Sequence, residues 1–324
     1  MPVPPSPAAT APLALVTGGA CFIGSHLAEH LGQNGWRVRI LDNFSSGRRE
    51  NLAAGAPGME IVAGDIRDRD QVRAACAGVS AVFHLAALVS VVESLNSSAL
   101  TEDINGRSTV NVLDAAAEAG VKRAVFSSAS AIDGDTPADP LAEDLPPAPA
   151  SPYASTKIAG ESLASHYAGR GLSVISLRYF NVYGPRQNPN SDYAAVIPRF
   201  IHLGLQRQRP IIYGDGGQTR DFIFVGDVAR ANLRAAEYFP GSSGAGVFNI
   251  GTGRAISVNS LWQHISHLVP CPPEATHAAA RPGEVRHSRA DISRAQAKLG
   301  FVPACSLEEG WDITLAALRA SPPP

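Results

Sequence analysis

Short apolar runs alternate with longer amphipathic stretches along the first half of the chain. The short runs are typical of strands buried on both faces of a parallel sheet. The stretches between them, rich in Ala, Leu and Glu, favour helices such as His26–Gln33 and Thr109–Ala119. Strand–helix repetition with right-handed crossovers predicts an α/β fold with a doubly wound parallel sheet. The predicted strands are Leu13–Thr17, Val38–Asp42, Glu60–Gly64, Ala81–Leu85, Ala124–Ser127 and Ser173–Tyr179.

Prolines and a change of rhythm divide the chain. The segment from Asp135 to Pro152 is proline-rich, so we expect a surface loop that leads into a helix starting near Ser151. After Tyr179 the alternation loosens, and a strand-like run, Val247–Ile250, returns late, which predicts a smaller C-terminal α/β lobe whose chain re-enters the first domain once. The expected boundaries are 1–12 for a disordered leader, 13–180 plus 226–250 for the first domain, and 181–225 plus 251–320 for the lobe.

Composition excludes several classes of protein. Of the 324 residues, 45% are hydrophobic and 17% charged, enough apolar surface for a core, which excludes a chain disordered throughout. A net charge of −2 offers no basic surface for nucleic acid or an anionic membrane, and no apolar run approaches the roughly 18 residues of a membrane helix. The four scattered cysteines and the histidines show no metal-ligand spacing. We therefore expect a cytoplasmic protein with no metal site and no nucleic-acid or membrane partner.

A glycine-rich turn follows the first predicted strand, in the segment from Thr17 to His26. Glycines between a strand and a helix let the backbone approach a pyrophosphate, and the helix N-terminus supplies amide donors and a positive dipole end. Asp42 closes the second strand, where a carboxylate accepts the ribose hydroxyls of an adenosine and repels a 2′-phosphate. The pattern favours NAD over NADP, although Arg48 and Arg49 lie nearby and Asp42 also fits an ordinary strand-end cap.

Tyr153 and Lys157 stand four residues apart on a predicted helix, which places them on one face. A phenol with an ordinary pKa of about 10 is a poor base at neutral pH. A neighbouring ammonium, together with an oxidised nicotinamide, stabilises the phenolate and lowers that pKa. Such a pair can remove a hydroxyl proton while a hydride leaves the same carbon. On an arbitrary helix the same spacing is a solvated face, so the catalytic interpretation depends on the glycine-rich turn.

From about Leu13 to Leu318 the chain resembles the extended short-chain dehydrogenase/reductases, especially the nucleotide-sugar 4-epimerases that act on UDP-glucose and UDP-N-acetylglucosamine. The resemblance implies a Rossmann domain that binds NAD and a lobe that binds the sugar nucleotide. The segments that carry it, besides the turn and the Tyr–Lys pair, are Leu41–Gly47, Gly64–Arg67, His84–Ala87, Arg178–Arg186, Gly214–Phe222 and Arg281–Ser288.

The resemblance also assigns roles to individual positions. The cofactor-binding positions are Gly18, Cys21, Phe22, Ile23, Gly24, Asp42, Asn43, Ser45, Gly47, Asp65, Ile66, Leu85, Ala86, Ala87, Asn105, Tyr153, Lys157 and Tyr179, with Asp65 and Ile66 at the adenine. The substrate-binding positions are Ser90, Ser128, Ser130, Asn181, Val196, Tyr213, Arg220, Arg281, Glu284 and Ser288. Of these, Asn181, Arg220 and Arg281 suit a diphosphate and Glu284 a uridine ribose, and the small Ser288 leaves room for an acetamido group.

Three positions depart from the family pattern. Cys21 replaces the middle glycine of the turn, where a side chain could weaken cofactor binding or bring a redox-sensitive thiol to the phosphates. Ala129 occupies the place of the catalytic Ser or Thr, and Asp133 that of a tyrosine. We expect a neighbouring hydroxyl, Ser128 in preference to Ser130, to take the missing catalytic role beside Tyr153 and Lys157.

Three functions follow, in order of preference. The first is a 4-epimerase with tightly bound NAD, acting on a UDP-sugar (a dTDP-sugar is possible). The second is a nucleotide-sugar 4,6-dehydratase or decarboxylase; the dehydratases it resembles carry Asp-Glu after the catalytic Thr, where this chain has Ser130 and Ala131. The third is a non-catalytic NAD or sugar-nucleotide binding protein. Relatives of this kind dimerise, which predicts a homodimer through helices Thr109–Ala119 and Ala154–Ala168.

Overall fold

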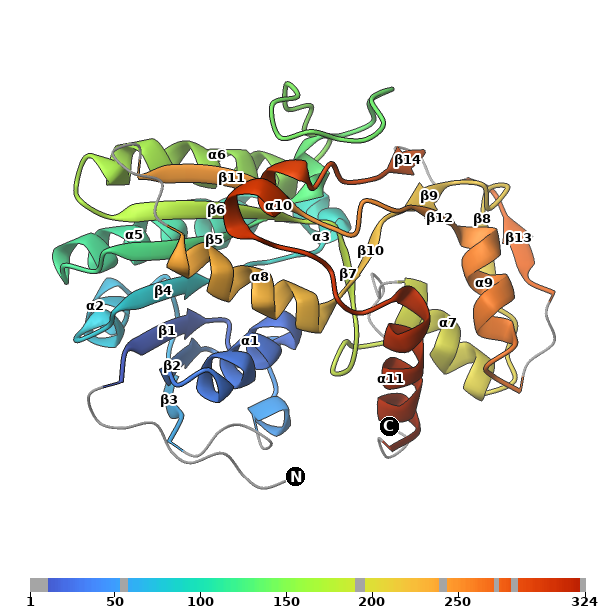
Figure 1. The fold of residues 1–324 in the computed structure, drawn as a ribbon, viewed down its shortest axis with the longest axis horizontal. Helices are drawn as coiled ribbons and strands as arrows, with labels where there is room; N and C mark the ends of the chain where they lie inside the picture. The colour runs from blue at the N-terminus through green and yellow to red at the C-terminus, as the bar shows by residue number, and fades with distance from the viewer. Residues whose placement is uncertain are drawn as a thin grey trace.

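The computed structural model describes residues 11–52, 58–189, 196–238, 244–270, 274–280 and 285–320 (Figure 1). The predicted disordered leader therefore lies outside the described residues except for residues 11 and 12. No helix among the described residues is long and apolar enough to cross a membrane.

A seven-stranded parallel sheet forms the centre of the first domain, with the strand order β11-β6-β5-β4-β1-β2-β3. The strands are β1 (Leu13–Thr17), β2 (Arg37–Asp42), β3 (Glu60–Ala63), β4 (Ala81–His84), β5 (Arg123–Ala129), β6 (Ser173–Tyr179) and β11 (Ala245–Ile250). The predicted doubly wound sheet is confirmed, and each predicted strand lies within one or two residues of an observed one. The fifth strand is longer than expected, because it runs on to Ala129 and so includes Ser128.

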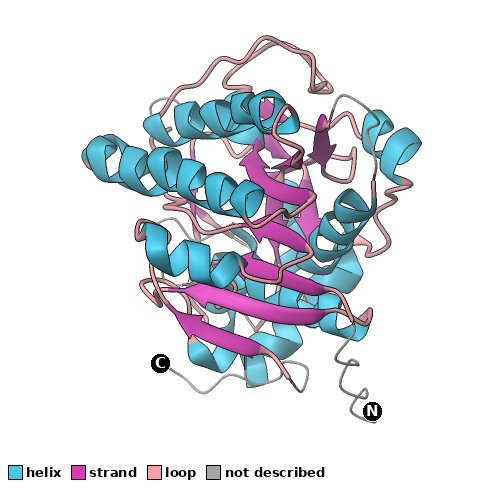
Figure 2. Cartoon of the chain, turned by 90° about the vertical axis from the view of Figure 1, so that its left-hand side faces the viewer, coloured by secondary structure: helices cyan, strands magenta, loops and turns pink. Residues whose placement is uncertain are grey.

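Helices cover both faces of this sheet (Figure 2). One face carries α2, α5 and α6, and the other carries α1 and α8, which pack side by side (Figure 1). Alternate residues of β1 point into the two apolar layers: Leu13 and Leu15 face one, Ala14 and Val16 the other. The helices of this domain are α1 (Phe22–Gln33), α2 (Arg69–Cys76), α3 (Val91–Asn96), α4 (Ser98–Thr101), a π-helix (Glu102–Arg107), α5 (Ser108–Glu118), α6 (Pro152–Ala168), α8 (Val225–Glu237) and α10 (Ser293–Leu299), with short 3-10 turns at Arg49–Leu52 and Ser130–Ile132.

The expected proline-rich loop precedes α6. Ser151 caps that helix, because its hydroxyl oxygen accepts a hydrogen bond of 3.2 Å from the amide of Ala154. Pro152 occupies the first helical turn, where its missing N–H costs nothing. This local start sets the position of Tyr153 one residue inside the helix.

The smaller lobe has its own apolar core, built around Tyr183, Phe200, Trp262 and Trp311. It lies on the right in Figure 1, beyond the carboxyl ends of β6 and β11. Its elements are β7 (Asn181–Tyr183), α7 (Val196–Leu205), β8 (Ile211–Tyr213), β9 (Thr219–Arg220), β10 (Phe222–Phe224), β12 (Ile256–Ser257), α9 (Val258–Ser266), β13 (Thr276–Ala278), β14 (His287–Ser288) and α11 (Leu307–Ala320).

The path of the chain between the two parts differs from the prediction. The chain re-enters the first domain with α8 and β11, as expected, but it returns again with α10, which packs against β11 and α8. Ala295, Leu299 and Phe301 join the apolar layer under the sheet. A single re-entry, with 251–320 wholly in the lobe, is therefore wrong, because the apolar side of α10 is buried on the first domain.

We expect Leu299→Ala to destabilise the protein by about 2 to 5 kcal/mol, because the truncation leaves a cavity in the core of the first domain. Val302→Ala is the control: its side chain is 63% exposed, so the free energy of unfolding should change by less than about 0.5 kcal/mol. Urea titration followed by circular dichroism measures both. Equal effects of the two changes would show that α10 is not part of this core.

Candidate active site

The glycine-rich turn after β1 packs at backbone contact, as a dinucleotide cradle requires. Gly18 adopts a φ of +68°, and its amide donates to the carbonyl oxygen of Leu41 at 2.9 Å. A Cβ on Gly18 would lie 2.8 Å from the amide nitrogen of Ala86, and one on Gly24 would lie 2.1 Å from the carbonyl oxygen of Gly18. Side chains are excluded from both positions, so the turn leaves open backbone at the N-terminus of α1.

Cys21 fits this turn without strain. It is the N-cap of α1 with φ −78° and ψ 180°, a conformation open to any residue, and its side chain makes no capping hydrogen bond. Burial, and next the negative charge of Asp42, raise the pKa of the Cys21 thiol to about 11. The thiol is therefore protonated at neutral pH, which removes the reactivity that a redox-sensitive cysteine needs.

Asp42 lies at the end of β2 where the adenosine ribose was predicted. Its carboxylate accepts hydrogen bonds from the amide of Ala20 at 2.9 Å and from the amide of Phe44 at 2.8 Å. A Cβ on Gly47 would lie 2.8 Å from Asp42 Oδ1, so the following loop closes over the carboxylate. Asp42 is thus both a cap of its own loop and a buried anion beside the glycine-rich turn.

In the part of the cofactor site where the adenine is expected, Asp65 joins two loops. Asn43 donates to its carboxylate at 3.0 Å, and Arg67 pairs with both carboxylate oxygens. These contacts, led by the Arg67 hydrogen bond, hold the pKa of Asp65 far below its ordinary value. Asn43 itself accepts from the amide of Ser45 at 3.0 Å, while Ile66 is buried beside this pair.

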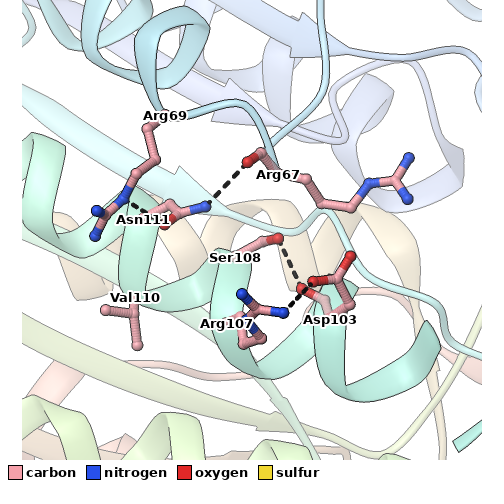
Figure 3. A pocket seen from close by; sticks show the side chains of 7 residues that line it. All are labelled: Arg67, Arg69, Asp103, Arg107, Ser108, Val110 and Asn111. Carbon is pink, nitrogen blue, oxygen red and sulfur yellow. Dashed lines mark hydrogen bonds and ion pairs between the residues drawn. The ribbon is translucent and has the colours of Figure 1, made fainter. Parts of the chain in front are cut away.

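A polar pocket of about 410 Å³ adjoins the same loops (Figure 3). It lies between the segment before α2 and the start of α5, and Arg107 at its mouth pairs with Asp103 at 3.3 Å. Ser108 donates to the carbonyl oxygen of Asp103 at 2.8 Å (Figure 3). The residues that line it are Arg67, Arg69, Asp103, Arg107, Ser108, Val110 and Asn111.

A chain of hydrogen bonds positions the segment after β4, and the sequence pattern did not predict it. His84 is 2% exposed, and its ring nitrogens lie 2.8 Å from Thr17 Oγ1 and 3.0 Å from Thr109 Oγ1. Thr109 donates to the carbonyl oxygen of Asn105, and the amide of Ala86 donates to Thr17. Burial, and next the charge of Lys157, lower the pKa of His84 to about 3, so the imidazole is neutral.

Asn105 extends this chain to the loop before α3. Its side chain accepts from the amide of Leu88 at 2.8 Å and donates to the carbonyl oxygen of Leu88 at 2.9 Å. The π-helix that carries Asn105 directs the side chain inward, where it is 3% exposed. Leu85, Ala86 and Ala87 are half-buried in the segment that this chain fixes, between the glycine-rich turn and α6.

Tyr153 and Lys157 occupy the buried face of α6 at the carboxyl edge of the sheet. Lys157 Nζ donates to the carbonyl oxygen of Ser127 at 2.7 Å and lies 5.6 Å from the ring centroid of Tyr153. Burial lowers the pKa of Lys157 to about 8, a shift that the carboxylate of Glu161 opposes. The ammonium is therefore charged at neutral pH and directed at the end of β5.

The expected lowering of the tyrosine pKa is not seen in the protein alone. Burial raises the pKa of Tyr153 well above its ordinary value, because a phenolate in an apolar site loses its hydration. Lys157 Nζ donates to the carbonyl oxygen of Ser127 and lies 5.6 Å from the ring centroid of Tyr153, and burial remains the cause that sets this pKa. An oxidised nicotinamide, when bound, would add the positive charge that lowers it.

Ser128 does not stand where the missing catalytic hydroxyl was expected. Its hydroxyl donates to Glu161 Oε1 at 2.6 Å, and the residue is 2% exposed. In the sheet it pairs with Arg178, on the face that α6 covers. Strand geometry thus directs Ser128 into a buried ion cluster, whereas Ala129 and Ser130 are half-buried at the open end of β5.

The lobe brings several of the predicted substrate residues to the same edge. Asn181 on β7 and Arg220 on β9 are half-buried, and Ser288 pairs with Arg220 in the β9–β14 ladder. The backbone of Asp221 joins this region, because its carbonyl oxygen accepts from the amide of Asn181 at 3.0 Å and its amide donates to the carbonyl oxygen of Ser288 at 2.8 Å. The buried carboxylate of Asp221 accepts hydrogen bonds from the amides of Thr252, Gly253 and Ala290. Nothing in the sequence pattern distinguished Asp221 from its neighbours.

Other predicted positions have local structural roles. The Ser90 hydroxyl caps α3 by accepting from the amide of Glu93 at 3.0 Å. Tyr179 belongs to the core, with its hydroxyl donating to Asn232 at 2.9 Å, so its assignment as a cofactor contact is not supported. Phe22 and Ile23 are half-buried in the first turn of α1, and Val196 and Tyr213 are half-buried in the lobe. Arg281 and Glu284 lie outside the described residues.

The fold and this edge of the sheet define a dinucleotide-dependent enzyme with a Tyr–Lys pair, and comparison with known proteins narrows the class. Residues 14–251 match the NAD dependent epimerase/dehydratase family, and the chain belongs to that family. The family dependence on NAD agrees with the glycine-rich turn, whose backbone contacts leave no room for side chains at Gly18 and Gly24.

Several relatives span nearly the whole chain. A UDP-glucose 4-epimerase of Mycolicibacterium smegmatis is 40% identical over 316 residues, which is 94% of this chain and 98% of that protein. A UDP-N-acetyl-α-D-glucosaminuronate decarboxylase of Bacillus cytotoxicus is 35% identical over 321 residues, 94% of this chain and 97% of that protein. The solved structure of a UDP-N-acetylglucosamine 4-epimerase from Methanobrevibacter ruminantium, in complex with UDP-N-acetylmuramic acid, superposes with a TM-score of 0.90 at 38% identity and covers 96% of this chain and 99% of that one.

Gly24→Ala should abolish measurable NAD binding, because the added methyl group would lie 2.1 Å from the carbonyl oxygen of Gly18 and force the turn open. Gly169→Ala, at the end of α6 with a φ of −63°, is the matched control and should leave NAD affinity unchanged. Calorimetric titration with NAD of protein stripped of nucleotide compares them. Wild-type affinity in Gly24→Ala would show that the turn does not hold the dinucleotide.

Proposed function

We propose that this protein interconverts the C4 epimers of a UDP-sugar with NAD as a resident cofactor. The observation that carries the proposal is the buried Tyr153–Lys157 pair, which lies at the same sheet edge as the glycine-rich turn and the Asn181–Arg220 strands of the lobe. A dinucleotide and a nucleotide-sugar can therefore meet at one phenol. The proposal agrees with the activities by which the epimerase relatives are named.

The residues of this chain supply the proton chemistry. Tyr153 takes the proton of the C4 hydroxyl and later returns it, while Lys157, charged below a pKa of about 8, stabilises the phenolate that forms. The glycine-rich turn at Gly18 and Gly24 and the carboxylate of Asp42 would hold NAD, which would supply a reversible hydride acceptor for C4. Because the cofactor would be regenerated in each cycle, turnover would not require it to dissociate. The close packing of the turn at Gly18 agrees with a tightly bound cofactor.

Ser130 replaces Ser128 as the candidate for the hydroxyl that hydrogen-bonds the sugar. It is half-buried at the start of the turn that follows β5, whereas the Ser128 hydroxyl is bonded to Glu161. Ala129 itself offers no donor, so proton transfer depends on Tyr153 more directly than in a complete Ser–Tyr–Lys arrangement.

The sugar nucleotide is bound by the lobe through the positions named from the resemblance. Asn181, Arg220 and Arg281 offer donors suited to a diphosphate, and Glu284 suits the uridine ribose. Ser288, small and 8% exposed beside Arg220, leaves room for an acetamido group, which favours UDP-N-acetylhexosamines alongside UDP-hexoses. Rates on UDP-glucose and UDP-N-acetylglucosamine compare the two, and a strong preference for the plain hexose would remove the acetamido proposal.

The second candidate is decarboxylation, favoured by the relative in Bacillus cytotoxicus. It shares the oxidation at C4 but needs a carboxylate at C6 of the substrate, so it is distinguished by the sugar and not by the Tyr–Lys pair. A 4,6-dehydratase fits less well, because Ser130 and Ala131 provide no acid and base for the loss of water.

Tyr153→Phe should lower turnover by about 10²- to 10⁴-fold while NAD stays bound, because the change removes the proton acceptor and keeps the ring. Tyr167→Phe makes the same change on the same helix, where the hydroxyl donates to Asp114 at 3.1 Å away from the sheet edge, and should keep activity. Proton NMR of each protein with UDP-glucose, UDP-N-acetylglucosamine and their 6-carboxylate forms identifies the product.

A new C4 epimer supports the epimerase, loss of CO₂ from the carboxylate sugar supports the decarboxylase, and a 6-deoxy-4-keto product supports the dehydratase. Undiminished turnover by Tyr153→Phe would contradict all three, since each requires this phenol.

The protein is expected to act in the cytoplasm, in keeping with the free thiols of Cys21, Cys76 and Cys305.

We infer that the active form is a homodimer through α5 and α6. Three exposed side chains along α6, those of Ser155, Ala159 and Ser162, are small, which allows another helix to approach closely. Next to them, on α3 and α4, Leu95 and Leu100 are 58% and 41% exposed. A second copy on this face would remove that apolar surface from water.

Ala159→Arg should convert the dimer to a monomer, because the charged side chain cannot be buried between closely packed helices. Light scattering at micromolar concentration measures the mass. Ser306→Arg, at the exposed start of α11 in the lobe, is the control and should remain dimeric. A monomeric wild-type protein at high concentration would rule the interface out.

A further inference from the structure

A buried ion cluster lies directly behind the catalytic lysine, and the departure at Asp133 is part of it. Arg178 is 4% exposed, and its Nε and Nη2 each donate to a different oxygen of Glu161 at 2.9 Å. Its remaining nitrogen, Nη1, lies 3.4 Å from Asp133 Oδ1 and 3.4 Å from the carbonyl oxygen of Glu143. One guanidinium thus serves two carboxylates through different edges.

The charges in this cluster do not cancel. The positive charge of Arg178 balances the negative charge of Glu161, and the side chain of Glu143 lies 3.5 Å from a different arginine, Arg294. Asp133, with a side chain only 1% exposed, adds a second negative charge, and its Oδ2 is buried without a hydrogen-bond partner. The cluster of Arg178, Glu161 and Asp133 therefore has a net charge of −1 when Asp133 is ionised.

The cluster reaches Lys157 through Glu161. Glu161 follows Lys157 by four residues on α6, which places the two side chains on one face about one helical turn apart. The other titratable groups facing Lys157 are Tyr153 on the same helix and the neutral His84 of β4. Neither of these two groups offers a negative charge, so the electrostatic support of the ammonium comes from the Ser127 carbonyl oxygen and from Glu161 of the cluster.

We propose that Asp133 is a positioning residue for the catalytic lysine: by sharing Arg178 with Glu161 it leaves the buried cluster with a net negative charge that keeps the Lys157 ammonium charged. Asp133 touches neither substrate nor cofactor and acts through Arg178 and Glu161. Burial raises the pKa of Asp133 to about 6, with Arg178 opposing the shift and Glu161 and Glu143 adding to it, so the group is ionised in the range where Lys157 titrates near pH 8.

The size of the effect follows from simple electrostatics. For a separation on the order of 10 Å and an effective dielectric constant of about 20, Coulomb's law gives a pKa shift of about one unit for a unit charge. Asp133→Asn should therefore lower the pKa of Lys157 by half a unit to one unit. Loss of a negative neighbour lowers the pKa of a cation. Lys157 should therefore lose its charge at a lower pH in Asp133→Asn than in the wild-type protein.

Lysine titration measures this directly, because the chain has only three lysines, Lys122, Lys157 and Lys298. Protein labelled with ¹³C at lysine Cε gives one NMR signal for each, and Lys157→Arg assigns the signal of interest. Asp133→Asn is compared with wild type, with Asp133→Glu, which keeps the charge, and with Asp144→Asn, the same change at an exposed position eleven residues further on in the same segment.

We expect the midpoint of Lys157 to fall in Asp133→Asn and to stay within about 0.2 units of wild type in Asp133→Glu and Asp144→Asn. In the wild-type protein the same signal should show a second, smaller inflection near pH 6 as Asp133 ionises. This inflection tests the coupling even if Asp133→Asn fails to fold. An unchanged midpoint in a folded variant, or a single wild-type inflection, overturns the proposal.

The kinetic consequence rests on the proposed function, whereas the NMR titration does not, so the two can fail separately. With an epimerase substrate, kcat of Asp133→Asn should decline at a pH half a unit to one unit lower than that of wild type, with KM unchanged. A merely structural role would lower kcat equally at every pH.

Discussion

The burial of one cation at the carboxyl edge of the sheet is the constraint on which the site depends. Lys157 can remain charged there only because the Ser127 carbonyl oxygen accepts a hydrogen bond from its Nζ at 2.7 Å and Glu161 lies one turn away. Those partners come from β5 and α6, so the register between this strand and this helix fixes the lysine and, with it, the phenol of Tyr153. A shift of either element by one residue would leave a buried charge without compensation.

The same requirement accounts for the unusual end of β5. Because Ser128 faces α6, its hydroxyl is used to satisfy Glu161, and Glu161 in turn holds Arg178. The buried hydroxyl of β5, on Ser128, is therefore bonded within the ion cluster. The next residue, Ala129, has only a methyl group at the open end of the strand. The absence of a hydroxyl at Ala129 and the presence of a carboxylate at Asp133 are linked through one cluster, because Ser128 donates to Glu161 and Glu161 shares Arg178 with Asp133.

At the glycine-rich turn after β1, the choice of side chain is limited by space and not by charge. Gly18 and Gly24 bring β1, α1 and the backbone of Ala86 into contact, and no side chain fits between them. Cys21 is tolerated in the same turn because its φ of −78° is ordinary and its thiol, with a pKa of about 11, remains neutral. The family pattern prescribes glycine at all three positions, but only two of them require it physically.

The sequence alone determined the elements and their order, because strand burial, proline positions and helix caps are local properties that leave a direct pattern along the chain. It also identified the glycine-rich turn and the Tyr153–Lys157 pair, whose spacing is itself the signal. Three results required the tertiary structure: the return of α10 to the first domain, the commitment of Ser128 to Glu161, and the sharing of Arg178 by Asp133 and Glu161. Each depends on residues far apart in the chain meeting in a water-free interior, where the partner of a polar group is set by packing and not by its neighbours in sequence.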